Sequence, residues 1–150
     1  NPAWHQKVTV QLREAGLTNV SYHLVDQPMA TGHPPTNDRH ENHRLYTEAA
    51  EGSLREHAPD ARADAILCDG ANRDTSASWA LEHVRPGGLV IIDNCNRFLP
   101  SATTAPASLA ASAPPLSPLW VEFQSRTSAW RRVWFSDGVA DTLVLFAPPA

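Results

Sequence analysis

The sequence predicts a single α/β domain with a mostly parallel sheet that ends in an antiparallel hairpin. Two short, continuous apolar runs, residues 65–68 and 89–92, have the composition of strands buried on both faces. A helical pattern over residues 75–84 separates them, as the crossover between two parallel strands requires. The turn sequence at residues 136–138 lies between two further apolar runs and predicts the hairpin.

The amino-terminal part predicts a helix, a strand, a loop and a second helix. Apolar residues recur at helical spacing over residues 3–15, and Gly16 follows as a typical helix stop. Apolar and polar residues alternate over residues 20–25, which indicates a strand near a sheet edge. Residues 26–42 contain several prolines and polar residues, so we expect a flexible loop. A modest helix over residues 45–54 follows.

The carboxyl-terminal part predicts one long loop between the parallel unit and the hairpin. The turn at residues 85–88, Arg-Pro-Gly-Gly, ends the third helix and precedes the strand at 89–92. Residues 100–118 are rich in Ser, Ala, Thr and Pro, a composition typical of a flexible loop. Residues 130–135 and 142–146 are the expected hairpin strands. Three tryptophans are expected to fill the core or to cover the sheet edge: Trp120, Trp130 and Trp134.

Composition excludes several classes of protein. The 150 residues include 12 basic and 16 acidic side chains, a formal charge of -4 with no long run of either sign, which does not favour a nucleic-acid partner. No apolar stretch approaches the roughly 20 residues that cross a bilayer, and no signal pattern opens the sequence. Cys68 and Cys95 lie in or beside apolar strands, as reduced thiols do. We therefore expect a cytoplasmic protein with a small-molecule substrate.

Polar side chains follow both strands of the predicted parallel pair. Asp69 comes directly after the first strand, and Asp93 and Asn94 directly after the second. Parallel strands end at the same edge of a sheet, which is where open α/β sheets bind ligands. Two interpretations stay open. The oxygens of these three residues suit a divalent cation such as magnesium, or the aspartates cap turns and helix starts.

Four more polar residues bear on this edge. Arg73 and Arg97 each lie four residues beyond an aspartate, where they could anchor an anionic substrate or pair with the carboxylates. We expect the pairing, since carboxylates at a sheet edge need a countercharge whether or not chemistry occurs there. Asp26 and Gln27 directly follow the strand expected at 20–25, so they too could reach a ligand.

Taken together, these residues resemble the carboxyl-terminal two-thirds of class I S-adenosylmethionine-dependent methyltransferases, in the branch similar to catechol O-methyltransferases. The resemblance covers most of residues 3–147. It is most specific where ADAILCDGANR, residues 63–73, is followed by LEHVRPGGLVIIDNCNR, residues 81–97, which is similar to the family's fourth and fifth strands. The resemblance implies a Rossmann-like sheet, S-adenosylmethionine as cofactor and methylation of a small-molecule hydroxyl.

The resemblance also implies roles for particular residues. Asp69, Asp93 and Asn94 fall where metal-dependent members hold magnesium, which would orient a substrate hydroxyl. Asp26 and Gln27 lie near the family's adenine-contacting loop, and Asp69 joins them among the expected cofactor-binding residues. The sequence identifies no general base.

The sequence departs from this family at the cofactor loop. The family's first two strands and its glycine-rich turn have no counterpart, and no G-x-G segment occurs in the chain. In the family's sheet the absent strands would lie between those expected at 20–25 and 65–68. We therefore expect a partial methyltransferase domain, completed by an amino-terminal segment or by a homo-oligomer. The alternative is a noncatalytic remnant or interaction module of the same fold.

Overall fold

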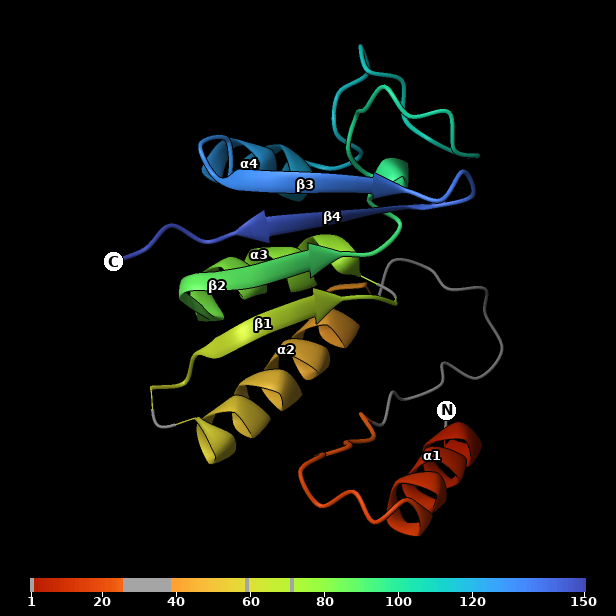
Figure 1. The fold of residues 1–150 in the computed structure, drawn as a ribbon, viewed down its shortest axis with the longest axis vertical. Helices are drawn as coiled ribbons and strands as arrows, with labels where there is room; N and C mark the ends of the chain where they lie inside the picture. The colour runs from red at the N-terminus through yellow and green to blue at the C-terminus, as the bar shows by residue number, and fades with distance from the viewer. Residues whose placement is uncertain (1, 26–38, 59, 71) are drawn as a thin grey trace. The chain divides into compact units, whose positions relative to one another are not determined.

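The computed structural model describes residues 2–25, 39–58, 60–70 and 72–150 (Figure 1). The chain divides into two compact units, Asn1–His57 and Ala58–Ala150. This division does not test the prediction of one partial domain over residues 1–150.

The first unit contains two helices, α1 (Pro2–Glu14) and α2 (Arg39–His57). α1 matches the helix predicted over residues 3–15. Gly16 takes a left-handed conformation with φ of 67°, and its backbone N–H donates to the carbonyl of Arg13 at 3.0 Å. This is the helix stop expected at that glycine, because a residue with a side chain rarely adopts a positive φ.

The strand expected at residues 20–25 is absent, and that prediction is wrong. These residues form no strand in the structure, and Val20 and Leu24 are exposed. The carbonyl of Tyr22 accepts a hydrogen bond from the His5 ring at 3.2 Å, and the two rings stack with centroids 4.8 Å apart. A strand exists only where a neighbour supplies backbone partners, which an alternating sequence pattern does not guarantee.

α2 corrects the boundary of the predicted loop. The helix begins at Arg39, so residues 39–42 of the loop expected over 26–42 are helical. The remainder, residues 26–38, lies outside the described residues. All prolines of that stretch precede Arg39, so none interrupts the helix. Near its end the helix carries an ion pair between Arg55 and Glu51, one turn apart.

The second unit is built on a four-stranded sheet in the order β1-β2-β4-β3 (Figure 1). β1 and β2 are parallel, whereas β4 is antiparallel to both of its neighbours, β2 and β3. The two predicted parallel strands and the hairpin are confirmed, but the strands are not buried on both faces as expected, since Leu67 of β1 is 63% exposed. The described sheet is nevertheless mixed rather than mostly parallel, because residues 20–25 add no parallel strand. The strand bounds are β1 (Ala63–Cys68), β2 (Val84–Ile92), β3 (Arg131–Ser136) and β4 (Asp141–Phe146).

The Pro-Gly-Gly turn lies inside β2 rather than before it. β2 begins at Val84, and its register with β1 shifts before Leu89. Gly87 has a φ of 77°. At Gly88 a β-carbon would lie 2.8 Å from the backbone oxygen of Asp64. The two glycines therefore let the chain bulge and then approach β1 too closely for any side chain.

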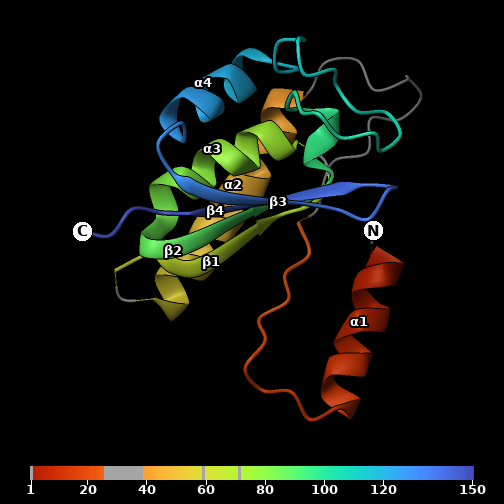
Figure 2. The same cartoon turned by 45° about the horizontal axis from the view of Figure 1, so that its top comes forward.

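Two helices cover one face of the sheet, as Figure 2 shows: α3 (Arg73–His83) and α4 (Pro118–Arg126). α3 was predicted, but α4 was not. Ser117 caps α4 by accepting a hydrogen bond from the backbone N–H of Trp120 at 3.4 Å, and Pro118 occupies the first helical turn. Both are standard helix-start signals.

The core lies between these helices and the sheet. Trp120 is 1% exposed, which confirms its predicted core position, and Trp130 and Trp134 are partly buried against the same cluster.

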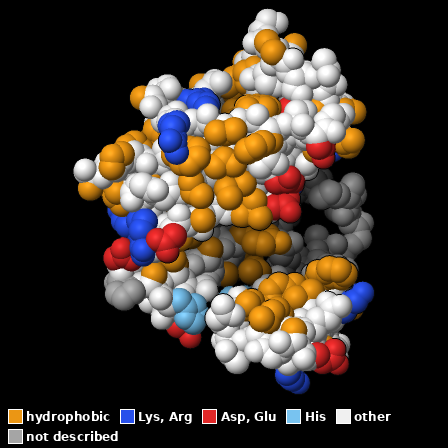
Figure 3. All heavy atoms as spheres, viewed as in Figure 1, with side chains coloured by type: hydrophobic (Ala, Val, Ile, Leu, Met, Phe, Trp, Pro, Cys, Tyr) orange, Lys and Arg blue, Asp and Glu red, His pale blue; other side chains and the backbone are white. Residues whose placement is uncertain are grey.

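On the opposite face of the sheet, side chains such as Leu67 and Phe135 are exposed, and Figure 3 shows hydrophobic side chains gathered over the strands. Among the described residues, no helix combines the length and apolar character needed to span a membrane.

The long loop before α4 is fixed by backbone hydrogen bonds to η1 (Cys95–Arg97), the short 3-10 helix after β2, and to its C-cap Phe98. Residues 101–117 contain no helix or strand, as predicted. The N–H of Leu109 donates to the carbonyl of Asn96, and the N–H of Leu116 donates to the carbonyl of Phe98, each at 2.9 Å. Flexibility of this loop stays a prediction.

Candidate functional site

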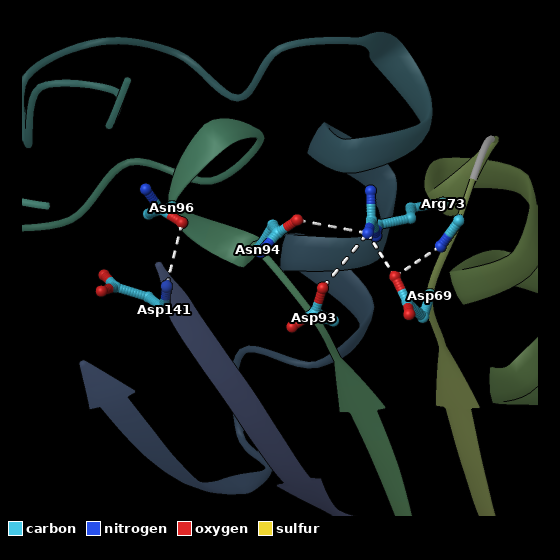
Figure 4. A network of polar contacts seen from close by, with 7 residues as sticks. Asp69, Arg73, Asp93, Asn94, Asn96 and Asp141 are labelled. Carbon is cyan, nitrogen blue, oxygen red and sulfur yellow. Dashed lines mark hydrogen bonds and ion pairs between the residues drawn. The ribbon is translucent and has the colours of Figure 1, made fainter. Parts of the chain in front are cut away.

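The carboxyl ends of β1 and β2 bring four polar residues together (Figure 4). Asp69 follows β1, Asp93 and Asn94 follow β2, and Arg73 is the first residue of α3. The backbone N–H of Asp93 donates to the carbonyl of Cys68 at 3.1 Å, which holds the two strand ends side by side. The expectation that Asp69, Asp93 and Asn94 lie close together agrees with this geometry.

The guanidinium of Arg73 lies at the centre of this group. Its Nη2 donates to Oδ1 of Asp69 at 2.5 Å, to Oδ2 of Asp93 at 3.2 Å and to Oδ1 of Asn94 at 3.3 Å. The Arg73 side chain is only 13% exposed, compared with 34% for Asp93 and 60% for Asp69. Arg73 therefore pairs with the carboxylates, as expected from the sequence.

Asp69 is the outward-facing acceptor of the group. The backbone N–H of Gly70 donates to its carboxylate at 2.6 Å and, with the Arg73 guanidinium, holds the pKa of Asp69 below its usual value despite some burial. One cation and two carboxylates give the group a formal charge of -1. The site as a whole therefore has a small net negative charge. Because its pKa is lowered, Asp69 is ionised at neutral pH.

The donor set does not fit a divalent cation while Arg73 is in place. The carboxylate and amide oxygens that were expected to hold magnesium converge on the Arg73 nitrogen, and a metal ion would compete with it for the same lone pairs. In the part of the chain that the structure describes, no cluster of three or more His, Cys, Asp or Glu side chains is arranged to hold a metal.

The other residues expected at this site do not join the group. Asp26 and Gln27 lie outside the described residues. Arg97 is exposed and makes no ion pair within residues 60–70 and 72–150, so it is not the partner of Asp93.

A second polar network, which the sequence analysis missed, lies beside the first (Figure 4). Asn96 and Asp141 are both fully buried. The backbone N–H of Asp141 donates to Oδ1 of Asn96 at 3.1 Å, and the indole N–H of Trp134 donates to Oδ2 of Asp141 at 2.7 Å. The Asn96 amide in turn donates to the carbonyl of Pro106 at 3.2 Å and to Oγ of Ser108 at 2.9 Å.

This network ties the long loop to the sheet. Burial alone would raise the pKa of Asp141, but hydrogen bonds from Ser136, Trp134 and Thr103 outweigh it, and the pKa lies below its usual value. Asn96 and Asp141 are 45 residues apart in the sequence. No local pattern marks the pair: Asn96 lies in the short 3-10 helix after β2, and Asp141 is the first residue of β4.

A small cavity lies away from the Arg73 group, between α4 and the β3–β4 hairpin. Its volume is about 160 Å³, and Ser101, Phe123, Arg132 and Trp134 are among its lining residues. Pockets for drug-sized ligands and cofactors usually measure about 300–1,000 Å³. This cavity is too small for a nucleoside cofactor.

Comparisons with known proteins give one weak structural likeness. No family model matches the sequence, and no curated protein matches it. A solved structure of an O-methyltransferase family protein from Burkholderia thailandensis aligns with a TM-score of 0.37 and 15% identity. The alignment covers 65% of this chain and 33% of that protein, so the chain spans about a third of its length. A likeness at this level does not establish a family.

Proposed function

We propose that this chain is part of an S-adenosylmethionine-dependent methyltransferase that methylates a hydroxyl group of a small molecule. One observation carries the proposal. Asp69, Asp93 and Asn94 directly follow two parallel strands that α3 connects, at the sheet edge where open α/β folds bind ligands. The sequence resemblance to catechol O-methyltransferase-like enzymes runs through the same residues, 63–73 and 81–97.

The charge of the site is compatible with this cofactor. When bound, S-adenosylmethionine supplies a methyl group on a positively charged sulfonium. The Arg73 group has a formal charge of -1, and Asp69 is 60% exposed at its outer side, where it can accept a hydrogen bond from a cofactor or substrate hydroxyl. Arg73 orients that carboxylate. Asp26 and Gln27 are the proposed adenine contacts. Magnesium is not part of the proposal, because Arg73 uses the oxygens that would bind it.

The second candidate function is a noncatalytic interaction module of the same fold. It is favoured by the large apolar side chains that the sheet of the second unit leaves exposed. An apolar sheet face with exposed Leu67, Val133 and Phe135 would then be its working surface.

Calorimetric titration with S-adenosylhomocysteine tests the proposal. The protein is titrated as these 150 residues and together with any segment that the native reading frame places upstream. We expect one cofactor per chain in at least the longer form, with affinity reduced about tenfold or more by Asp69→Asn. Asp64→Asn is the matched control, because Asp64 lies on the same strand at its opposite end.

Two results would decide against the enzyme. Absence of binding by both forms favours the interaction module. Equal losses in Asp69→Asn and Asp64→Asn would mean that cofactor binds away from the carboxyl edge of β1.

A further inference from the structure

Arg73 has the surroundings of a bound metal ion rather than those of a surface arginine. Three oxygens from three residues approach one nitrogen, Nη2, within 3.3 Å. Two of them come from carboxylates and one from an amide, which are the oxygen types that hard divalent cations prefer. The Nε of Arg73 is buried and has no hydrogen-bond partner among the described residues. The guanidinium is therefore positioned by the three oxygens around Nη2, since its Nε makes no hydrogen bond.

The guanidinium also packs against Phe98, a partly buried ring at the edge of the core. Its Cζ lies 5.7 Å from the centroid of the Phe98 ring, and Phe98 stacks on the buried Trp120 with centroids 5.5 Å apart. A cation over an aromatic face is attracted to it, more strongly where solvent is excluded. Because Arg73 is also the first residue of α3, both its backbone and its charged end are fixed.

Another arginine of the same unit provides the contrast. Arg85 contacts two carboxylates, Asp64 at 2.6 Å and Asp60 at 3.5 Å. Its side chain is 39% exposed, and those carboxylates are 82% and 55% exposed. The backbone carbonyl of Arg62 also accepts from Nη2 of Arg85, at 3.2 Å, and the Arg85 Nε is buried without a partner, as in Arg73. The two groups differ because the oxygens around Arg85 are divided between Nη1 and Nη2 and its carboxylates are more exposed, which is the character of a surface ion pair.

We propose that Arg73 is a built-in cation that takes the place of a divalent metal ion at this sheet edge. Its fixed charge orients Asp69, Asp93 and Asn94 and provides the countercharge for the two carboxylates, so the site requires no metal. Replacing Arg73 by a neutral residue exposes three converging oxygens with two uncompensated negative charges. A divalent cation then binds there. The inference does not depend on the proposed function, since it concerns metal binding by the protein alone.

Thermal unfolding with and without metal tests the inference. Wild type and Arg73→Met are compared in EDTA, MgCl₂ and MnCl₂. We expect no change in the wild-type Tm, a lower Tm for Arg73→Met in EDTA, and a rise of about 5 °C or more in that variant at saturating MnCl₂. Adding Asp93→Asn to Arg73→Met should abolish the rise. Arg85→Met is the matched control and should gain no rise.

Three outcomes would overturn the inference. A saturable rise in wild type that Asp93→Asn removes would mean that metal binds beside Arg73. A folded Arg73→Met variant with no rise would mean that the oxygens do not form a cation site. A rise in Arg73→Lys, which keeps the charge, would mean that the charge is not what excludes metal.

A folding defect in Arg73→Met does not remove the test. If that variant is unfolded in EDTA, recovery of its circular dichroism spectrum is followed on addition of MnCl₂. Recovery is the expected result, and continued absence of structure at saturating MnCl₂ contradicts the inference.

Discussion

Replacing Asn96 by alanine should destabilise the second unit by about 3 kcal/mol. Asn96 is fully buried and connects three parts of that unit: the 3-10 helix η1 that follows β2, the long loop and the first residue of β4. Its side chain makes three hydrogen bonds, to the carbonyl of Pro106, to Oγ of Ser108 and from the backbone N–H of Asp141. Alanine makes none of them.

The magnitude follows from these contacts. Each hydrogen bond contributes about 1 kcal/mol net, because the unfolded chain bonds to water instead. The buried N–H of Asp141 also loses its acceptor, and an unsatisfied buried donor costs about 1–3 kcal/mol. Some of this cost overlaps with the bond already counted. The total of about 3 kcal/mol is a large fraction of the stability of a small domain.

Urea unfolding monitored by tryptophan fluorescence measures the loss, because Trp120, Trp130 and Trp134 all belong to or pack against the core of this unit. Asn19→Ala is the control: Asn19 is exposed, and its replacement should change stability by no more than about 0.5 kcal/mol. A loss below about 1 kcal/mol for Asn96→Ala would refute the reasoning, since water would then replace the three bonds without cost.

Three further predictions concern the same unit and the glycine of α2. Gly88→Ala should lower the free energy of unfolding by about 2 kcal/mol or more, because the new β-carbon would lie 2.8 Å from the backbone of β1. Gly52→Ala is the control: Gly52 lies in helix α2 with open space around it, so the change should be neutral or stabilising. Urea unfolding measures both. Because the pKa of Asp141 is lower in the folded protein than its usual value of 3.8, ionised Asp141 stabilises the fold. This stabilisation is complete above the pKa of the unfolded state and is lost as the pH falls through the pKa of the folded state. Wild-type stability should therefore fall between about pH 5 and about pH 2 more steeply than that of Asp141→Asn, and equal slopes would contradict the assigned shift. Burial raises the pKa of both Cys68 and Cys95 to about 12. Neither thiol should therefore react with a disulfide reagent at pH 8 until the protein unfolds. Rapid labelling of the folded protein would contradict this, because it would show that a thiol is accessible.

The parts of the fold that the sequence predicted are those with local signals. The apolar runs at 65–68 and 89–92 mark β1 and β2, and Gly16 marks the end of α1, because each depends on neighbours within a few residues. The crossover rule then brings Asp69 and Asp93 to one edge. That part of the candidate site was predictable without coordinates.

The parts that were missed depend on contacts across the chain or on a signal hidden in a biased composition. Residues 20–25 alternate like a strand, but pairing requires a partner strand that the described chain does not supply. Ser117 and Pro118 start α4 at the end of a stretch whose Ser- and Pro-rich composition indicated only a loop. The sequence offered two partners for Asp69 and Asp93, Arg73 and Arg97. Only side-chain geometry separates the arginine that pairs from the one that does not.

The position of β4 in the sheet has a consequence for synthesis on the ribosome. β4 is the last strand along this chain, yet it is an interior strand, hydrogen-bonded to β2 on one side and to β3 on the other. β1 and β2 can pair as soon as they leave the exit tunnel, but β2 keeps an open edge and a half-covered core until residues 141–146 emerge. The nascent chain therefore carries an unfinished sheet from the synthesis of Ile92 until that of β4, and a stall before Asp141 would leave a template for intermolecular strand pairing.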